Sequence, residues 1–364
     1  MKKFISIALV FCLALTAFIF VGCSNENNRI KLEGGPEITE LVTGNGSFQV
    51  RKGDYIYFAS GYVASSDLGT GGLTNELGKV SNGALYRAKI ELKKTLIDKE
   101  DKEEGEEDQY KEEYVLSEVQ LLCSKVVGYE NSGLYIFGNK IYFGTPSTIK
   151  NSEGKVMYSL LTFYSVDLDG QNLTEIYQTT EFSRSYSFIS INGNLYLLIF
   201  DGSKILRVDM NGNSKVLATD VKSAVLPKSI VVAENSYSAT ENEKYIYYTI
   251  ANNKNTDTRD YGNVLCKANI ISGEATELFK EDYLTITLSK FENDKLYYKR
   301  NVLLSEMSPS SESYLFVNDL TGKTFQDSEK QLTSQSAIST MIEFKYEADN
   351  YDGYVYVNGG KLYY

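Results

Sequence analysis

Asp and Glu carboxylates are the side chains capable of catalysis or metal binding that this sequence supplies in number. It has 48 Asp and Glu residues, 37 Lys and Arg residues and no His. The absence of His excludes a Ser-His-Asp triad, a Cys-His pair and every zinc, copper or iron site that needs a His ligand. Two acids can hydrolyse a glycosidic bond without His. The acids are scattered along the chain, so no catalytic, cofactor-binding, metal-binding or ligand-binding set can be named from the sequence.

Asp167 and Asp169, in the stretch VDLDGQN, come nearest to a calcium loop. The remaining ligands of such a loop, including its distant Glu, are missing, although calcium is the metal that these carboxylates would suit best. Asp-Gly is a common hairpin turn, and Asn211-Gly212 stands in a similar stretch further along. We therefore predict that both aspartates belong to a turn and bind no metal.

Of the four cysteines, Cys123 and Cys266 follow the N-terminal region and lie in apolar, strand-like stretches, VQLLCSK and NVLCKAN. They could form one disulfide. Because we place the two stretches in different repeat units, we predict two buried, reduced thiols instead.

The first 22 residues have the order of a secretory signal: Lys2 and Lys3, an uncharged apolar run over 4–21, then Gly and Cys23. The V-G-C sequence resembles a lipobox, which implies that Cys23 carries lipid and anchors an extracytoplasmic protein to the bacterial cell membrane. An uncleaved transmembrane anchor is the alternative. Residues 23–35, whose polar part is SNENNRIKLEGG, then form the lipidated N-terminus and a tether.

The charge balance restricts the partners. Without residues 1–22 the formal net charge is about −13, and no segment gathers cations. This excludes nucleic acid as a partner and excludes electrostatic docking on anionic lipid. The membrane link must therefore be covalent.

A short motif of apolar residues and Tyr after an Asn, Asp or Gly turn recurs about every fifty residues, with one longer interval after the first copy. The copies are GDYIYF (53–58), GNKIYF (138–143), NGNLYLL (192–198), NEKYIYY (242–248), NDKLYY (293–298) and YDGYVYV (351–357). A short strand precedes most copies across a turn, and a third and fourth strand follow. Four strands at this period predict the blade of a β-propeller.

We predict an all-β propeller over residues 36–364, with six four-stranded blades. The last unit ends after YVYVNGGKLYY without a fourth strand, and 38–43 near the start resembles the fourth strand of another unit, LTEIYQTT. Pairing these two ends would close the ring and leave no long edge. Five or seven blades remain alternatives, because the strand after SYLFVNDLTGK is poorly marked.

These repeats resemble the YWTD-type propeller of low-density-lipoprotein receptors, and resemble more closely bacterial secreted proteins that carry the domain of unknown function 5050. The resemblance covers residues 36–364, although the chain has no Trp and no literal YWTD. It implies the fold and leaves the function open.

The connections between second and third strands are long in most units: 61–82, 145–158, 252–262 and 302–313. Insertions gathered on one face often mark a binding face, although drift in exposed loops explains them equally well. The acidic insertion 93–113 has ten acids and five bases and is expected to project from the opposite face as a mobile or marginally helical segment. Solvation, docking to a basic partner or loose calcium binding could explain it.

From these features we expect a non-catalytic, membrane-anchored propeller that binds or scaffolds a protein, peptide or glycan at the cell surface. The alternative is a His-free hydrolase of glycans or lactones that relies on carboxylates, with calcium as a candidate metal.

Overall fold

The computed structural model describes residues 42–61, 83–96, 110–127, 133–183, 185–227, 241–252, 262–282, 284–292, 294–305, 308–333, 356–358 and 361–363. Within these ranges the secondary structure is β strand, with two short 3-10 turns, η4 (Asn242–Lys244) and η5 (Gln326–Ser328). No helix in the described ranges is long and apolar enough to cross a bilayer. The predicted signal, Cys23 and the tether lie outside the described residues.

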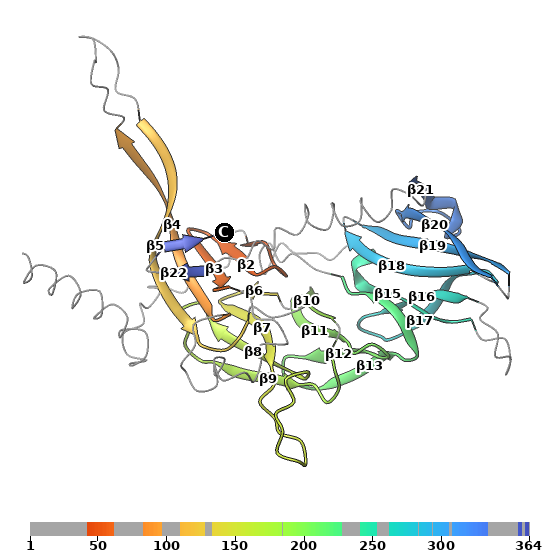
Figure 1. Ribbon diagram of the computed structural model, residues 1–364, viewed down its shortest axis with the longest axis horizontal. Helices are drawn as coiled ribbons and strands as arrows, with labels where there is room; N and C mark the ends of the chain where they lie inside the picture. Colours follow the sequence, from red (N-terminus) through yellow and green to blue (C-terminus); the bar gives the residue numbers. More distant parts are fainter. Residues whose placement is uncertain are drawn as a thin grey trace, which may run out of the picture.

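The strands form five successive antiparallel sheets, each built in chain order (Figure 1). Sheet 1 contains β1 (Val42–Thr43), β2 (Gln49–Lys52), β3 (Tyr55–Ala59), β4 (Leu85–Leu96) and β5 (Tyr110–Cys123). Sheet 2 contains β6 (Tyr135–Phe137), β7 (Lys140–Pro146), β8 (Leu161–Asp167) and β9 (Thr174–Gln178). Sheet 3 contains β10 (Ser185–Ile191), β11 (Asn194–Phe200), β12 (Ile205–Asp209) and β13 (Ser214–Ala218).

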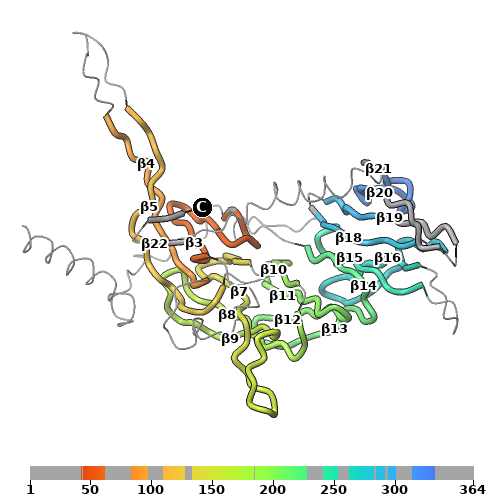
Figure 2. Tube along the Cα trace, in the orientation of Figure 1, coloured from red at the N-terminus to blue at the C-terminus, as the bar shows by residue number. Residues whose placement is uncertain are grey.

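Two further four-stranded sheets and one short pair complete the described strands. Sheet 4 contains β14 (Val221–Val225), β15 (Tyr245–Ala251), β16 (Asn263–Asn269) and β17 (Ala275–Lys280). Sheet 5 contains β18 (Leu284–Glu292), β19 (Lys295–Ser305), β20 (Ser308–Asn318) and β21 (Glu329–Thr333). The short pair consists of β22 (Tyr356–Asn358) and β23 (Lys361–Tyr363). The chain can be followed through the sheets by colour in Figure 2.

The predicted repeat corresponds to these sheets. The Tyr-containing motif forms the second strand of sheets 2 to 5, namely β7, β11, β15 and β19, and it forms β3 in sheet 1, where the additional edge strand β1 makes it the third strand. The sixth copy forms β22, which pairs only with β23 among the described strands. The poorly marked fourth strand of the fifth unit is β21. The four-stranded antiparallel unit is thus confirmed five times, as in a propeller-like all-β fold.

Each sheet buries its faces against its neighbours in the chain, and the alternation within a strand divides the side chains between two interfaces. In β11, Leu195, Leu197 and Ile199 belong to the core between sheets 2 and 3. Leu198 and Phe200 of the same strand belong to the core between sheets 3 and 4. Similar apolar cores join sheets 1 and 2 and sheets 4 and 5. Sheet-to-sheet packing in series explains why the inner strands are apolar on both faces.

Predicted elements in sheets 4 and 5 differ in the structure. The first strand of sheet 4 is β14, Val221–Val225; the apolar stretch SIVVAE (229–234), which the repeat predicts as the strand before the fourth copy of the motif, lies outside the described residues. Residues 302–313 were predicted as a long loop, but β19 and β20 continue there as a paired ribbon, with Val302 opposite Glu312 and Ser305 opposite Ser308. A two-stranded ribbon needs only paired backbones.

The predicted ring closure is not seen among the described residues. Val42 and Thr43, the described part of the 38–43 stretch, pair with Lys52 and Arg51 in β2 instead of the C-terminal strand. A short strand next to its own hairpin closes a small loop, which costs less entropy than pairing with the far end of the chain.

The ends of the acidic insertion are strands and not a marginal helix. Leu96 is opposite Tyr110, and Lys93 is opposite Glu113, in a continuation of the β4–β5 ladder. Residues 97–109 lie outside the described residues. Cross-strand ion pairing of Lys94 with Glu112 offsets the weak strand propensity of these charged residues.

Candidate functional site

The two cysteines are free and buried, as predicted. Cys123 belongs to the core between sheets 1 and 2, and Cys266 to the core between sheets 3 and 4. Burial raises the pKa of the Cys266 thiol to about 11. The thiol is therefore protonated at neutral pH and is a poor nucleophile.

Asp167 and Asp169 form the turn that the sequence predicts. The Gly170 N–H donates to the Asp167 carbonyl oxygen at 2.7 Å, and the Gln171 N–H donates to Asp169 Oδ1 at 2.9 Å. The Asp167 carboxylate accepts hydrogen bonds from Lys140 Nζ and Asn172 Nδ2. The described residues contain no group of three or more carboxylate or thiol side chains that could hold a metal ion.

An arginine at a repeated position links one sheet to the next. Arg87 in β4 donates from Nη1 to the carbonyl oxygen of Leu168, in the β8–β9 turn, at 3.4 Å. Arg207 in β12 donates from Nη1 to Ile270 O at 3.2 Å and to Ile271 O at 2.9 Å, in the β16–β17 turn. Both arginines lie in the strand that follows the Tyr-containing motif, β4 in sheet 1 and β12 in sheet 3, and both contact the third-to-fourth turn of the following sheet. We call this contact the arginine lock.

Glycines at the tips of these turns make the close approach possible. Gly170 has φ +82°, and a Cβ there would lie 2.9 Å from Leu122 O in sheet 1. Gly212 in the β12–β13 turn has φ +83°, and a Cβ there would lie 2.8 Å from Ile176 O in sheet 2. Each turn therefore packs on the outer strand of the preceding sheet, where a side chain would not fit.

The junction between sheets 2 and 3 uses a tyrosine. Tyr186 in β10 donates to Gly133 O at 2.9 Å and accepts from the N–H groups of Gly133 and Gly144 at 2.9 and 3.0 Å. Its hydroxyl thus satisfies three backbone groups of sheet 2. Burial raises the pKa of Tyr186 to about 12. The arginine position of sheet 2 is occupied by Ser165, which is too short to reach the next turn.

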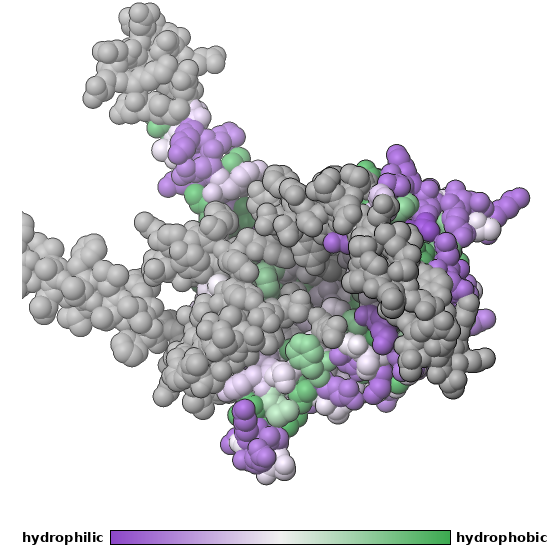
Figure 3. Space-filling model, turned by 45° about the vertical axis from the view of Figure 1, so that its right-hand side comes forward, coloured by the Kyte–Doolittle hydropathy of each residue, from purple (hydrophilic) through white to green (hydrophobic). Residues whose placement is uncertain are grey.

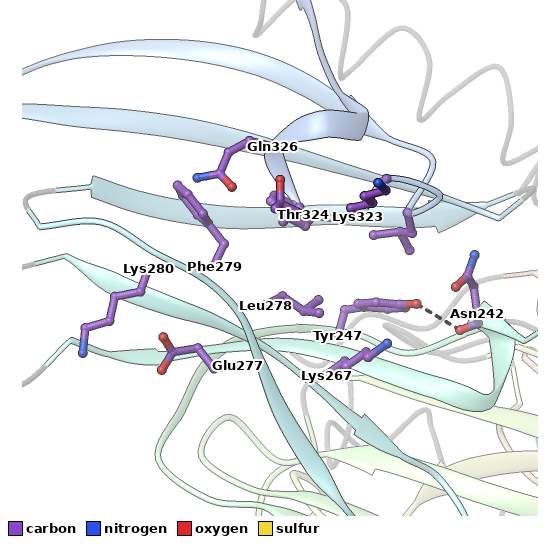
Figure 4. A pocket seen from close by; sticks show the side chains of 13 residues that line it. Asn242, Tyr247, Lys267, Glu277, Leu278, Phe279, Lys280, Lys323, Thr324 and Gln326 are labelled. Atoms are coloured by element: carbon purple, nitrogen blue, oxygen red, sulfur yellow. Dashed lines mark hydrogen bonds between the residues drawn. The ribbon is translucent and has the colours of Figure 1, made fainter.

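The junction between sheets 4 and 5 has no arginine lock among the described residues; its polar link is the side chain of Asn263, which donates to Ile286 O at 2.8 Å and accepts from the Ile286 N–H at 2.7 Å. Lys267 occupies the arginine position in β16, and its Nζ lies 4.4 Å from the centre of the Tyr245 ring. No hydrogen bond joins Lys267 to the β20–β21 connection among the described residues. That connection runs from 319 to 328 and includes η5, whereas the β12–β13 connection runs only from 210 to 213. A cavity of about 610 Å³ lies between sheet 4 and the β20–β21 connection (Figure 4).

The cavity is walled by β15, β16 and β17 on the sheet 4 side and by the β20–β21 connection on the sheet 5 side. Its lining residues are Asn242, Tyr247, Lys267, Glu277, Leu278, Phe279, Lys280, Leu320, Gly322, Lys323, Thr324, Phe325 and Gln326. Three lysines face one glutamate, so the lining carries a net positive charge although the whole chain carries −11. We call this site the junction pocket.

The floor of the junction pocket is aromatic and rigid. The Phe279 and Phe325 rings stack with centroids 5.7 Å apart and both are buried. The Tyr247 hydroxyl donates to Asn242 O at 3.2 Å, and burial raises the pKa of Tyr247. In Figure 4, Tyr247 lies in the centre of the pocket, between Lys267 below and Lys323 above.

A half-buried ion pair supports this floor from sheet 5. Arg300 lies over the rings of Phe279 and Phe316, with its guanidinium carbon 5.4 and 5.1 Å from their centroids. Its Nη1 pairs with Glu329, which also accepts from the Tyr298 hydroxyl. Burial and the hydrogen bond to Glu329 raise the pKa of Tyr298. The network fixes Phe279 in position without placing a free charge in the pocket.

The junction pocket lies at the end of the sheets where first and second strands, and third and fourth strands, are joined. The loops predicted to form a binding face join second and third strands, and the described strand ends that they connect lie at the other end. Among them, 145–158 is a compact finger with a bridge between Lys150 and Val156, and Asn151 Oδ1 accepts from the N–H groups of Glu153 and Lys155. Most of 61–82 and 252–262 lies outside the described residues.

The comparisons with known proteins assign no family to this chain. No family model matches it, and no curated protein matches it. Solved structures match at low similarity. They include the cobalt-substituted apocarotenoid oxygenase of Synechocystis (12% identity, TM-score 0.35, 80% of this chain and 71% of that chain) and the tricorn protease (11%, 0.37, 83% and 26%). TolB from Acinetobacter baumannii is a third (12%, 0.31, 55% and 42%). This chain thus spans well under two thirds of the tricorn protease and of TolB.

Proposed function

We propose that this chain is a lipid-anchored extracytoplasmic protein whose propeller-like domain binds a carboxylate-rich partner, a peptide or a glycan, without transforming it. The observation that carries the proposal is the junction pocket. It lies between sheets 4 and 5, where a lysine takes the position of the arginine in the lock, and it gathers Lys267, Lys280 and Lys323 around a single Glu277. Cations gathered in a hollow with apolar walls attract anions more strongly than isolated surface lysines do.

A test of binding uses poly-L-glutamate and oligogalacturonate as probes, in calorimetric titrations with the full chain. One of the two is expected to bind, with affinity that falls as salt is raised. Lys267→Gln and Lys323→Gln should each weaken binding about tenfold, which corresponds to about 1.4 kcal/mol. Lys155→Gln, in the exposed finger of sheet 2, is the matched control and should change nothing. Equal affinity in all variants would overturn the proposal.

The alternative of a His-free hydrolase requires two acids across a bound glycosidic bond. Among the described residues that line the junction pocket, Glu277 is the single acid. No described pair of acids is therefore brought to this pocket, and binding without catalysis is the function that we propose.

Six sheets and ring closure form part of the same proposal. The face of sheet 1 that points away from sheet 2 carries a second apolar cluster, in which Phe58 and Ala88 are fully buried. The named members of that cluster all belong to sheet 1, so they need a cover from another part of the chain. We infer that the C-terminal unit, 334–363, supplies it. A chain that ends at 333 should then melt at lower temperature and bind a hydrophobic dye, whereas unchanged melting would contradict closure.

The anchor rests on the sequence of residues 1–23. Cys23→Ala should block lipid attachment and release the chain from the membrane fraction, because a covalent acyl chain is the proposed membrane link. A variant that is still processed and membrane-bound would contradict this part of the proposal.

A further inference from the structure

The outer strand of each sheet, β5, β9, β13, β17 or β21, contains a bulge at the same point of the repeat. In β9 the register of pairing with β8 shifts at Ile176, which is the extra residue of the bulge. A bulge takes its extra residue out of the ladder and bends the strand. The extra residues of the five sheets are all apolar, and we call them the bulge residues: Leu122, Ile176, Leu217, Leu278 and Leu332.

In three junctions, a tight turn of one sheet packs on the bulge residue of the sheet before it. The Lys215 ammonium group, next to one bulge residue, also donates to Ser272 O of the turn that packs there. The glycines of the three turns have φ between +75° and +83°, a conformation that glycine adopts without strain, so each turn has glycine at its tip. The pairs of turn glycine and bulge residue are Gly170 with Leu122, Gly212 with Ile176 and Gly273 with Leu217.

The junction between sheets 4 and 5 departs from this pattern at Leu278. The corresponding connection of sheet 5, 319–328, contains one glycine, Gly322. A Cβ at Gly322 would lie 2.6 Å from Ser328 Oγ and 2.7 Å from Asp327 Cβ, both in the same connection. Gly322 therefore packs on its own connection. Leu278 lines the junction pocket beside Tyr247 (Figure 4), so the pocket lies where the other three junctions have a turn.

The polar groups of the pocket suit an acidic turn. Lys267 stands where sheet 1 has Arg87, and Arg87 donates to the carbonyl oxygen of Leu168 in the turn of sheet 2. A lysine ammonium group can donate to a carbonyl or a carboxylate oxygen. The turn that packs on Leu122 has the sequence DLDG (167–170) and carries two carboxylates. The described surface of sheets 4 and 5, turned forward in Figure 3, is mainly hydrophilic, which favours a charged turn over an apolar one.

We propose that the junction pocket binds an acidic turn of a partner protein, with Asp before Gly, in the place that the chain's own turns take in the other junctions. The inference rests on the proposed function and selects a peptide over a glycan. The glycine of the bound turn packs on Leu278, Lys267 donates to a carbonyl oxygen of the turn, and Lys323 on the opposite wall pairs with the carboxylate. A preformed turn loses little conformational freedom on binding, which favours affinity.

The test uses two disulfide-closed peptides of equal charge in calorimetric titrations with the full chain. One contains VDLDGQN, the sequence of residues 166–172, and the other has Ala in place of its Gly. The Gly peptide is expected to bind at least about tenfold more tightly, because a Cβ at this point would meet the backbone of the bulge residue. Lys267→Gln should weaken its binding about tenfold. Lys215→Gln alters a lysine at the junction of sheets 3 and 4 and is the matched control, with unchanged binding.

A second pair of variants locates the contact. Leu278→Trp places a large ring where the glycine of the bound turn would lie, and it should remove the difference between the two peptides. Val216→Trp adds the same ring at a position of β13 that is 49% exposed, and it should preserve the difference. Retention of the difference in the Leu278→Trp variant, with an unchanged melting temperature, would overturn the inference because the peptide would then bind elsewhere.

Three further results would overturn the inference. Equal affinity of both peptides for the unaltered chain would show that the pocket does not distinguish a turn, and the proposed function would stand if Lys267→Gln still weakened the binding of poly-L-glutamate. Tighter binding of oligogalacturonate than of the Gly peptide would favour a glycan. Self-association in sedimentation that Lys267→Gln abolishes would assign the pocket to a second copy of the chain. Failure of every acidic probe to bind would overturn the proposed function as well.

Discussion

Sheets 1 and 2 pack through an apolar core, and so do sheets 4 and 5, but the two junctions differ in the side chain at the arginine position. In the first, Arg87 is 1% exposed and reaches across to the following turn. In the second, Lys267 occupies the same place in the repeat and stays over a ring of its own sheet. The apolar cores of the two junctions are similar in kind. The difference teaches that sheet packing is set by the apolar core, whereas the polar link decides whether the rim of a junction is closed.

The reason lies in the chemistry of the two cations. A guanidinium has a planar fork of donors that can serve two carbonyl groups at once, as Arg207 does with Ile270 and Ile271. A lysine ammonium is more strongly hydrated and is a point charge on a flexible stem. Lysine at the rim is therefore compatible with a solvated pocket, and arginine with a dry contact.

Loss of an arginine lock should have the largest effect. Arg87→Leu removes a buried charge that donates to Gln120 Oε1 at 3.1 Å and to Leu168 O. Leu168 O would remain buried without this donor and the half-buried Gln120 side chain would lose its partner, so we expect a loss of about 3 kcal/mol in the free energy of unfolding. Urea denaturation measures it. A loss below about 1 kcal/mol would show that the lock contributes little to the packing of sheets 1 and 2.

The turn glycines allow a matched test of close packing. Gly170 and Gly154 have nearly equal φ angles, +82° and +79°, but a Cβ at Gly170 meets the backbone of Leu122, whereas a Cβ at Gly154 meets nothing within 4 Å. Both changes to Ala share a cost of about 1 kcal/mol for a left-handed backbone. Gly170→Ala should cost about 2 kcal/mol more, because the β8–β9 turn of sheet 2 must move away from Leu122 in sheet 1. Equal losses in denaturation would show that the turn does not contact the preceding sheet closely.

The tyrosine link between sheets 2 and 3 should depend on pH. The pKa of Tyr186 is raised from about 10 in the unfolded chain to about 12 by burial. Its contribution is therefore complete below pH 10 and is lost as the pH rises from 10 to 12. Tyr186→Phe leaves the N–H groups of Gly133 and Gly144 unpaired, and should cost about 2 kcal/mol at neutral pH.

Alkaline denaturation followed by circular dichroism tests this dependence. The variant should show a shallower fall in stability between pH 10 and 12 than the unaltered chain. Tyr177→Phe, at a partly buried ring in the same junction, is the control. Identical pH profiles for the Tyr186→Phe variant and the unaltered chain would show that ionisation of Tyr186 does not cause the loss of stability at high pH.

The sequence predicts the sheets well and the junction pocket poorly. Tyr-rich motifs after Asn, Asp or Gly turns locate the second strand of each unit, because apolar alternation and turn chemistry are local signals. The pocket depends on two smaller departures from the repeat, Lys267 where other units have Arg87 and Arg207, and the longer stretch after Asn318. Both departures are visible in the aligned repeats. Their meaning becomes clear only when the third strand of one sheet is known to face the turn of the next.

The N-terminal edge shows a second limit of sequence patterns. The likeness of 38–43 to a fourth strand suggested a partner at the C-terminus, but Val42 and Thr43 pair with β2. A strand pattern identifies a segment that can pair and does not identify its partner. The β4–β5 hairpin shows the same limit, since the charged composition of 93–113 suggested a marginal helix where the described ends of this segment are paired strands.

Introduction of an arginine at the lock position between sheets 4 and 5 should have the smallest effect on stability, and it tests the comparison of the two junctions most directly. Lys267→Arg places a fork of donors opposite the β20–β21 connection, which starts at Asp319. If the fork reaches a carbonyl group there, the free energy of unfolding should rise by about 1 kcal/mol, which raises the melting temperature by a few degrees. The pocket should narrow at the same time and bind the acidic probe less well, although its charge is unchanged. Increased stability with unaltered affinity would separate the lock from the pocket, and would show that the absent arginine does not account for the cavity.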